Sequence, residues 1–121
     1  MSLIATLISL AAAAALPSAP ADGISDAARI IGDQDRAALT QAIASLQKDT
    51  GVRLFIETNS YLGETVNLGE RTRDLIREWG QGKPSAVICV DRSSTAPPSI
   101  QFSEAVWARY NTQDVVNTLR T

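Results

Sequence analysis

The 121-residue sequence contains no histidine. This absence excludes catalytic triads that use a histidine base, and it excludes zinc sites with histidine ligands. The sequence has a single cysteine, Cys89, which cannot form a disulfide within the chain. Because Cys89 lies in the apolar run from 86 to 90, we expect it to pack as a small buried hydrophobe. Chemistry in this protein is therefore left to carboxylates, arginines, hydroxyls or Cys89, and the position of Cys89 favours the buried structural role.

An excess of positive charge is also missing. The chain has 11 Lys and Arg against 13 Asp and Glu, which gives a formal net charge of −2 and excludes a polybasic nucleic-acid binder. The stretch Gly80-Gln81-Gly82-Lys83 lies after an expected helix and before an expected strand. A phosphate-binding loop needs the reverse order, so we predict no nucleotide partner and no organic cofactor.

What is present is typical of one globular domain preceded by an apolar segment. With 45% hydrophobic and 20% charged residues, the composition is close to the globular average. No charged side chain occurs before Asp22, and the apolar run from 3 to 16 is followed by Pro17 and small residues. We predict a secretory signal-like segment over 1–21 and the domain over 22–121. The apolar run is shorter than the roughly 20 residues that cross a bilayer. The alternative to a signal is a core helix.

Hydrophobic spacing predicts helices and strands that alternate along the domain. Apolar residues recur at helical spacing from 33 to 49 and again from 68 to 79, while the runs 52–58 and 86–90 are typical of strands. An edge strand is expected within 22–31, a returning strand at 99–103, and one or two helical pieces over 104–121, with Thr112 as the cap of the second.

This order predicts an α/β fold. Strands joined through helices run parallel, whereas the loop from 91 to 98 is too short for such a crossover and favours an antiparallel hairpin. We therefore expect a mixed, mostly parallel sheet of about four strands.

Acidic and amide side chains follow the expected parallel strands. Open α/β sheets bind ligands beyond the carboxyl ends of their strands, where Asp26, Glu57, Asn59 and Asp91 are expected to meet. Carboxylate and amide oxygens are the ligands that Ca²⁺ and Mg²⁺ prefer, so the pattern predicts a divalent-cation site. Spacing leaves a second interpretation open, in which Glu57 faces solvent and the two aspartates form local turns.

The second expected helix carries arginines among acids. Arg71, Arg73 and Arg77 alternate with Glu70, Asp74 and Glu78, which predicts a solvated, ion-paired face rather than an anion site.

The segment from about Ile24 to Leu119 resembles the TPM domain family, which is named for a thylakoid-lumen phosphoprotein and for many exported bacterial proteins. The resemblance is carried by Ile24-Ser25-Asp26-Ala27-Ala28, by Leu62-Gly63-Glu64 after the strand from 52 to 58, by Trp79-Gly80-Gln81-Gly82-Lys83, and by the strand that closes on Asp91-Arg92. The chain departs from the family where Val90 replaces the first of two adjacent aspartates, which leaves one carboxylate there.

The resemblance implies a three-layer α-β-α sandwich, an exported location (periplasmic, extracellular or membrane-associated) and a divalent-metal site. It leaves two hypotheses for the function. In the first, the domain is a binding or accessory module that holds Ca²⁺ or Mg²⁺ and acts on an unidentified protein partner at a membrane surface. In the alternative, it is a weakly active, metal-assisted acid phosphatase for phosphate monoesters, in which Arg92 neutralises charge that develops on the phosphoryl group.

Overall fold

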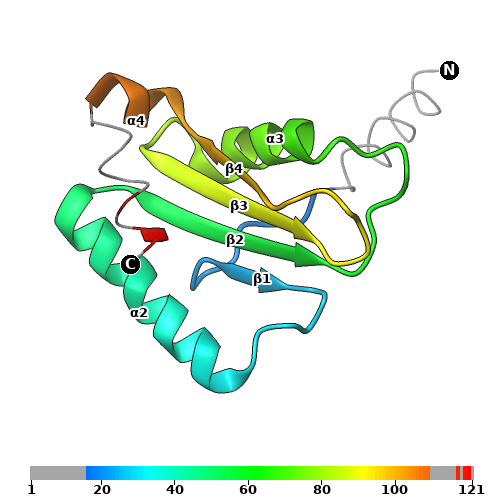
Figure 1. Cartoon of the computed structure of the whole chain (residues 1–121). Coiled ribbons are helices and arrows are strands. Elements are labelled where there is room, and N and C mark those ends of the chain that lie inside the picture. The colour runs from blue at the N-terminus through cyan, green and yellow to red at the C-terminus, as the bar shows by residue number, and fades with distance from the viewer. Residues whose placement is uncertain (1–15, 110–116, 118, 121) are drawn as a thin grey trace, which may run out of the picture.

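The computed structural model of the chain describes residues 16–109, 117, 119 and 120. Figure 1 shows the helices and strands of this part of the chain, which follow one another in the order β1 (Ile24–Asp26), α2 (Asp33–Thr50), β2 (Arg53–Asn59), α3 (Leu68–Gly80), β3 (Ser85–Asp91), β4 (Ser99–Phe102) and α4 (Glu104–Arg109).

The four strands form one sheet in the order β1-β2-β3-β4. β1 pairs with β2 and β2 with β3 in parallel, whereas β3 and β4 are antiparallel. The prediction of an α/β fold with a mixed, mostly parallel sheet is thus confirmed. The length of the connections explains the strand directions. The two connections that contain a helix join parallel strands, and the short loop joins the antiparallel pair.

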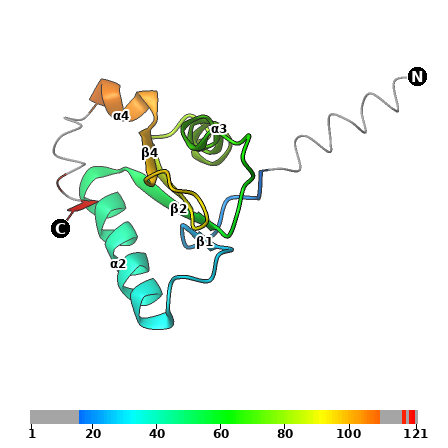
Figure 2. The same ribbon diagram turned by 45° about the vertical axis from the view of Figure 1, so that its right-hand side comes forward.

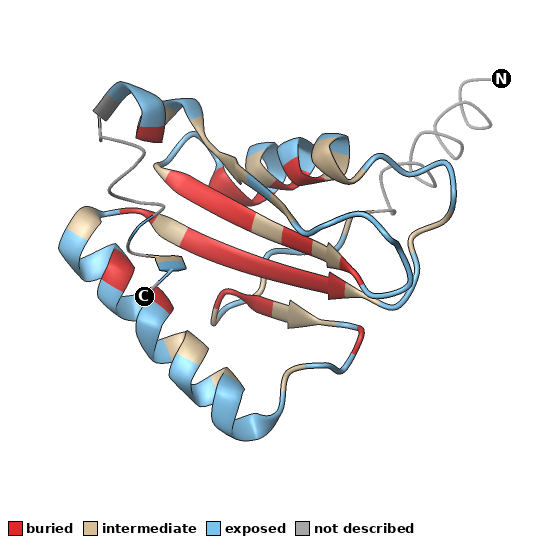
Figure 3. Ribbon diagram, viewed as in Figure 1, coloured by how far each residue is buried: buried red, intermediate tan, exposed pale blue. Residues whose placement is uncertain are grey.

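The two long helices cover opposite faces of the sheet, as Figure 2 shows, so the molecule has the three layers of an α-β-α sandwich. Successive side chains in β2 alternate between these faces. Leu54 and Ile56 belong to the core beneath α2, whereas Phe55 packs in the core beneath α3. β2 and β3 are therefore buried on both sides, and Figure 3 shows them as the most buried part of the fold.

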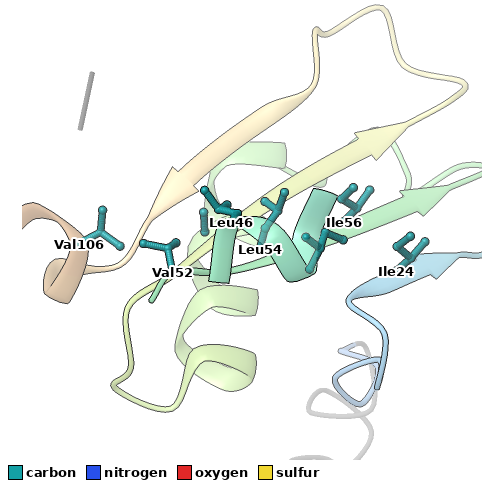
Figure 4. Close-up of a cluster of buried hydrophobic side chains, with 8 residues drawn as sticks. Ile24, Leu46, Val52, Leu54, Ile56 and Val106 are labelled. Carbon is teal, nitrogen blue, oxygen red and sulfur yellow. The ribbon is translucent and has the colours of Figure 1, made fainter. Parts of the chain in front are cut away.

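The core beneath α2 is aliphatic. Ile43 and Leu46 of the helix meet the sheet face, and Figure 4 shows Leu46 among the clustered side chains Ile24, Val52, Leu54, Ile56 and Val106. α2 ends where sequence spacing predicts an end, because Gly51 adopts a left-handed conformation with φ of 76° and its N–H donates to the carbonyl of Gln47.

The core beneath α3 contains aromatic rings. Leu75 and Trp79 pack against Phe55, Val87 and Cys89, and the rings of Phe55 and Trp79 lie 5.5 Å apart. Cys89 is fully buried, as the sequence predicted.

Some predicted features fall at or beyond the edges of the described structure. β1 is shorter than the segment 22–31 that could have formed an edge strand. α4 confirms the first predicted C-terminal helical piece, while Thr112 and most of the second piece lie outside the described residues. Within the described residues, no helix is long and apolar enough to span a membrane.

Residues 16 and 17 pack onto the α3 side of the domain. Leu16 contacts the core beneath α3, and the indole N–H of Trp79 donates to the carbonyl of Pro17 over 2.9 Å. Since Trp79 is only 2% exposed, this carbonyl satisfies a buried donor.

We therefore expect a chain that begins at Ser18, which lacks Leu16 and Pro17 but keeps the Pro20 carbonyl that accepts from Gly23, to be less stable than one that begins at Leu16. Leaving the buried indole N–H without an acceptor costs about 1–3 kcal/mol, and the loss of Leu16 adds to this. Urea unfolding of the two chains measures the difference. Introducing Trp79→Phe into both chains removes the donor, so the difference between the two lengths should shrink to the part that Leu16 contributes. Equal midpoints for the two chains with Trp79 would mean that these contacts do not stabilise the domain.

Candidate functional site at the carboxyl ends of the strands

The predicted ligands come to one edge of the sheet. Asp26 ends β1 opposite Thr58, and Asn59 ends β2 opposite Asp91 of β3. Parallel pairing therefore brings Asp26, Asn59 and Asp91 to the same end of the molecule, where sequence spacing predicted them.

The same register divides these residues between the two faces of the sheet. Ile24 and Ile56 face α2, so alternation places Asp26 and Thr58 on that face. Val87 and Cys89 face α3, which places Glu57 and Asp91 on the opposite face. Within the described residues, no group of three or more acidic, cysteine or histidine side chains is arranged to hold a metal ion.

Asp26 organises the loop that follows β1. One carboxylate oxygen accepts hydrogen bonds from the hydroxyl of Thr58 and the N–H of Ile30, and the other accepts from the N–H of Ile31 over 3.0 Å. Desolvation opposes ionisation of Asp26, but these hydrogen bonds and the nearby charge of Arg36 outweigh it and lower the pKa of the carboxyl. The contacts match the local-turn interpretation of Asp26.

Glu57 lies inside the molecule with a bidentate ion pair. Its side chain is 1% exposed, and each carboxylate oxygen accepts a hydrogen bond of 2.8 Å from the guanidinium of Arg71. The amide of Asn59 and the thiol of Cys89 donate to the same carboxylate over 2.7 and 3.1 Å. The interpretation in which Glu57 faces solvent is therefore wrong.

The Arg71 contact also corrects the prediction for α3. Arg71 is turned toward the sheet, so the arginines of this helix do not form one solvated, ion-paired face. Of the pairings expected along the helix, the Arg77–Asp74 pair is present, at 3.8 Å between exposed side chains.

Charge and burial together determine how Glu57 and Cys89 titrate. Burial raises the pKa of Glu57, but the hydrogen bonds from Arg71, Cys89 and Asn59 and the charge of Arg71 outweigh it, so the pKa is below its ordinary value. Burial, followed by the neighbouring carboxylate of Glu57, raises the pKa of the Cys89 thiol to about 12. Cys89 is therefore a thiol at neutral pH and a poor nucleophile.

Asp91 lines a pocket on the α3 side of the strand ends. Its side chain is 9% exposed, and its two oxygens accept hydrogen bonds of 3.1 Å from the main-chain N–H groups of Leu62 and Ser93. The bond to Ser93 spans two residues and forms an Asx turn, as the local-turn interpretation predicted.

The pocket has a volume of about 480 Å³ and lies between the loop after β2 and the loop after β3. Its described lining includes the carboxylates of Asp91 and Glu64 and the hydroxyl-bearing residues Tyr61, Ser93, Ser94 and Thr95. Neither lysine nor arginine is among these lining residues, so the pocket has an acidic character.

Arg92 follows Asp91 in the sequence but makes its contacts outside the Asp91 pocket. Its guanidinium donates to the carbonyl of Ala28 over 3.3 Å, and its main-chain N–H donates to the carbonyl of Asn59 over 2.8 Å. Arg92 therefore ties the loop after β1 to the end of β3, and it is not among the residues that line the Asp91 pocket.

Sequence reasoning missed two parts of this arrangement. Glu64 was noted only as part of the stretch that follows the strand from 52 to 58, and only the fold brings this stretch beside Asp91. Arg71 was grouped with its exposed neighbours, although its alignment with buried Thr72 and Leu75 on α3 is a signal that it lies near the covered face.

The three layers and the mixed, mostly parallel sheet define an α/β domain, with a pocket at the carboxyl ends of its parallel strands. The family model of the TPM domain matches residues 24–115, which include every strand and the site described above. The chain belongs to the TPM domain family. A search of curated proteins found no match to the chain.

Proposed function

We propose that this TPM domain is a binding module whose ligand site is the Asp91 pocket, and that the pocket takes a divalent cation, Ca²⁺ or Mg²⁺. The observation that carries the proposal is the charge of the lining, because the charged residues described there, Asp91 and Glu64, are both carboxylates. Two carboxylates around one pocket repel each other when no cation lies between them, and a bound cation relieves that repulsion.

The donor set of the pocket fits a hard cation with several water ligands. Each Asp91 oxygen accepts one main-chain N–H and retains a second lone pair for a metal. Glu64 is exposed, and the hydroxyls of Ser93 and Thr95 are further oxygen donors at the rim. Ca²⁺ takes 6–8 oxygen ligands and tolerates water among them, so we expect weak binding. Glu57 does not fit this role, since it is buried and Arg71 holds both of its oxygens. Asp26 does not fit it either, because it lies on the other face of the sheet from the Asp91 pocket.

Thermal unfolding tests the cation site. A cation present at ten times its Kd stabilises the folded state by about 1.4 kcal/mol, which raises Tm by roughly 5 °C for a domain of this size. We expect this rise in the native chain and its loss in Asp91→Asn. Asp26→Asn is the matched control, because it removes a carboxylate from the same edge but from the other face of the sheet. A Tm that does not respond to either cation would contradict the proposal, as would a response that survives Asp91→Asn and disappears in Asp26→Asn.

The phosphatase hypothesis has less support from the geometry. That hypothesis gave Arg92 the role of neutralising charge on the phosphoryl group beside the metal, whereas Arg92 donates to the carbonyl of Ala28 and does not line the Asp91 pocket. We therefore propose that the domain binds rather than hydrolyses. Release of phosphate from an aryl phosphate by the native chain, with loss of that activity in Asp91→Asn, would favour the enzyme instead.

We further propose that the protein is exported and meets a protein partner at a membrane. The uncharged, largely apolar sequence before Asp22 supports export, and the exposed loops around the Asp91 pocket offer a surface for a protein partner at a membrane. Fractionation of cells that express the full chain tests the location.

A further inference from the structure

A second cleft lies at the other end of the sheet, where β3 begins and β4 ends. Its volume is about 580 Å³. One wall is formed by α3, the opposite wall by β4 and the start of α4, and the turn from 82 to 83 closes one side. Asp91 marks the far end of β3, so this cleft is separate from the pocket of the proposed function.

The described lining of this cleft is positively charged. The lining includes Arg73, Arg77, Lys83 and Glu104, which gives three positive charges against one negative charge. The whole chain has a net charge of −2, so this local excess runs against the overall balance. An anion in the cleft would therefore be attracted to it although the protein as a whole repels anions.

The positively charged side chains of this cleft have few partners within the described residues. Within the described part of the chain, the side chains of Arg73 and Lys83 have neither a hydrogen bond nor an ion pair. Arg77 has its long contact of 3.8 Å with Asp74, in which both side chains are largely exposed. Such an exposed pair contributes little and exchanges readily for a ligand.

The cleft also has an apolar part. Ile76 of α3 and Phe102 and Ala105 on the opposite wall line it beside the cations. Phe102 is held by an edge-to-face contact with Trp107, with ring centroids 6.1 Å apart. A ligand with a small apolar body can therefore pack here while its charged groups meet the arginines.

The turn that supplies Lys83 is fixed by hydrogen bonds. The Lys83 N–H donates to the carbonyl of Gly80 over 3.0 Å, and the Lys83 carbonyl accepts from the hydroxyls of Ser85 and Ser103 over 3.0 and 3.3 Å. Gly80 lies so close to Ser85 that an added Cβ would come within 2.3 Å of its hydroxyl oxygen. The main chain that carries Lys83 is thus preorganised, which reduces the entropy lost when a ligand binds.

We infer that this cleft binds a small organic dianion, a phosphate monoester or a dicarboxylate with an apolar body. Arginine presents a planar fork of donors that matches both phosphate and carboxylate, and lysine supplies a point charge to the same group. The inference does not rest on the proposed function, because none of the described residues lines both sites.

Calorimetric titration of the full chain with phenyl phosphate tests the inference, with isophthalate as the dicarboxylate probe and phenol as the uncharged probe. We expect saturable binding of a dianion, weaker at high salt, and no binding of phenol. Tighter binding of phenyl phosphate assigns the site to phosphate monoesters, and tighter binding of isophthalate assigns it to dicarboxylates. Arg73→Gln and Lys83→Gln should each weaken the binding about tenfold or more, since each removes a charge-assisted hydrogen bond.

Lys48→Gln is the matched control, because it also removes one positive charge but lies at the end of α2 on the other face of the sheet. Binding in this variant should equal that of the native chain. The inference is overturned if neither dianion binds, if Lys48→Gln weakens binding as much as Lys83→Gln, or if the binding is insensitive to Arg73 and Lys83 and is lost in Asp91→Asn. The last result would place the ligand in the Asp91 pocket. The proposed cation site in that pocket would still be tested separately by its Tm measurement.

Discussion

Replacement of Arg71 by methionine is expected to lower the free energy of unfolding by about 3–5 kcal/mol, because it leaves a buried carboxylate without its partner. Glu57 is 1% exposed and receives two of its hydrogen bonds from Arg71. The remaining donors, Asn59 and Cys89, are neutral and cannot replace the lost charge. Since small domains have a total stability of about 5–15 kcal/mol, this single change can remove a large share of it.

The loss of the ion pair in Arg71→Met should also change how the free energy of unfolding depends on pH. In the native chain the pKa of Glu57 is below its ordinary value of 4.5, so the stability from this group is present above that pH and is lost as the pH falls through the folded-state pKa. Without Arg71, burial dominates and the Glu57 pKa rises above its unfolded value. The contribution of Glu57 to the stability of the variant then increases as the pH falls. The difference in the free energy of unfolding between the native chain and the variant therefore becomes smaller between pH 7 and pH 5.

The matched control is Glu57→Gln in the Arg71→Met background, because glutamine keeps an acceptor for Asn59 and Cys89 and carries no charge. We expect this double variant to be more stable than Arg71→Met alone. Urea unfolding at pH 7 and pH 5 measures all three chains. A loss below 1 kcal/mol in Arg71→Met, or a double variant no more stable than the single one, would show that the ion pair does not hold α3 to the sheet.

Replacement of Leu75 by alanine is expected to cost about 2–5 kcal/mol. Leu75 is fully buried in the core beneath α3, together with Phe55 and Trp79, and the close packing of this core prevents it from closing the resulting cavity. Ile100→Ala on β4 is the control, because that side chain is 45% exposed and should cost much less.

The Leu75→Ala variant also separates stability from binding. Leu75 does not line the Asp91 pocket, so the native Tm response to Ca²⁺ or Mg²⁺ should persist from a lower starting Tm. Equal losses in Leu75→Ala and Ile100→Ala, measured by urea unfolding, would contradict the assignment of the core beneath α3.

The fold was largely predictable because local patterns and connection lengths determine it. The spacing of apolar residues in α2, the left-handed Gly51 that ends it, and the continuous apolar run of β3 each have a direct structural consequence. The short loop before β4 determined its antiparallel direction. The fully buried Cys89 followed from the same apolar run.

The candidate site was predictable in its location but not in its contacts. The end of the strands follows from topology, whereas the face on which a side chain lies depends on the register, which placed Asp26 and Asp91 on opposite sides. Arg71 could not be paired with Glu57 from spacing alone, because the two residues come from different elements. Glu64 joins the site through a loop whose conformation no periodic pattern specifies.

The central claim is that the Asp91 pocket, and not the Asp26 side of the strand ends, takes a cation. The most direct measurement is a Ca²⁺ titration of the full chain followed by amide NMR. The N–H groups of Leu62 and Ser93 donate to Asp91, and those of Ile30 and Ile31 donate to Asp26, so these four amides report on the two sites separately. We predict saturable shifts at Leu62 and Ser93 with little change at Ile30 and Ile31; shifts confined to Ile30 and Ile31, or none at all, would contradict the claim.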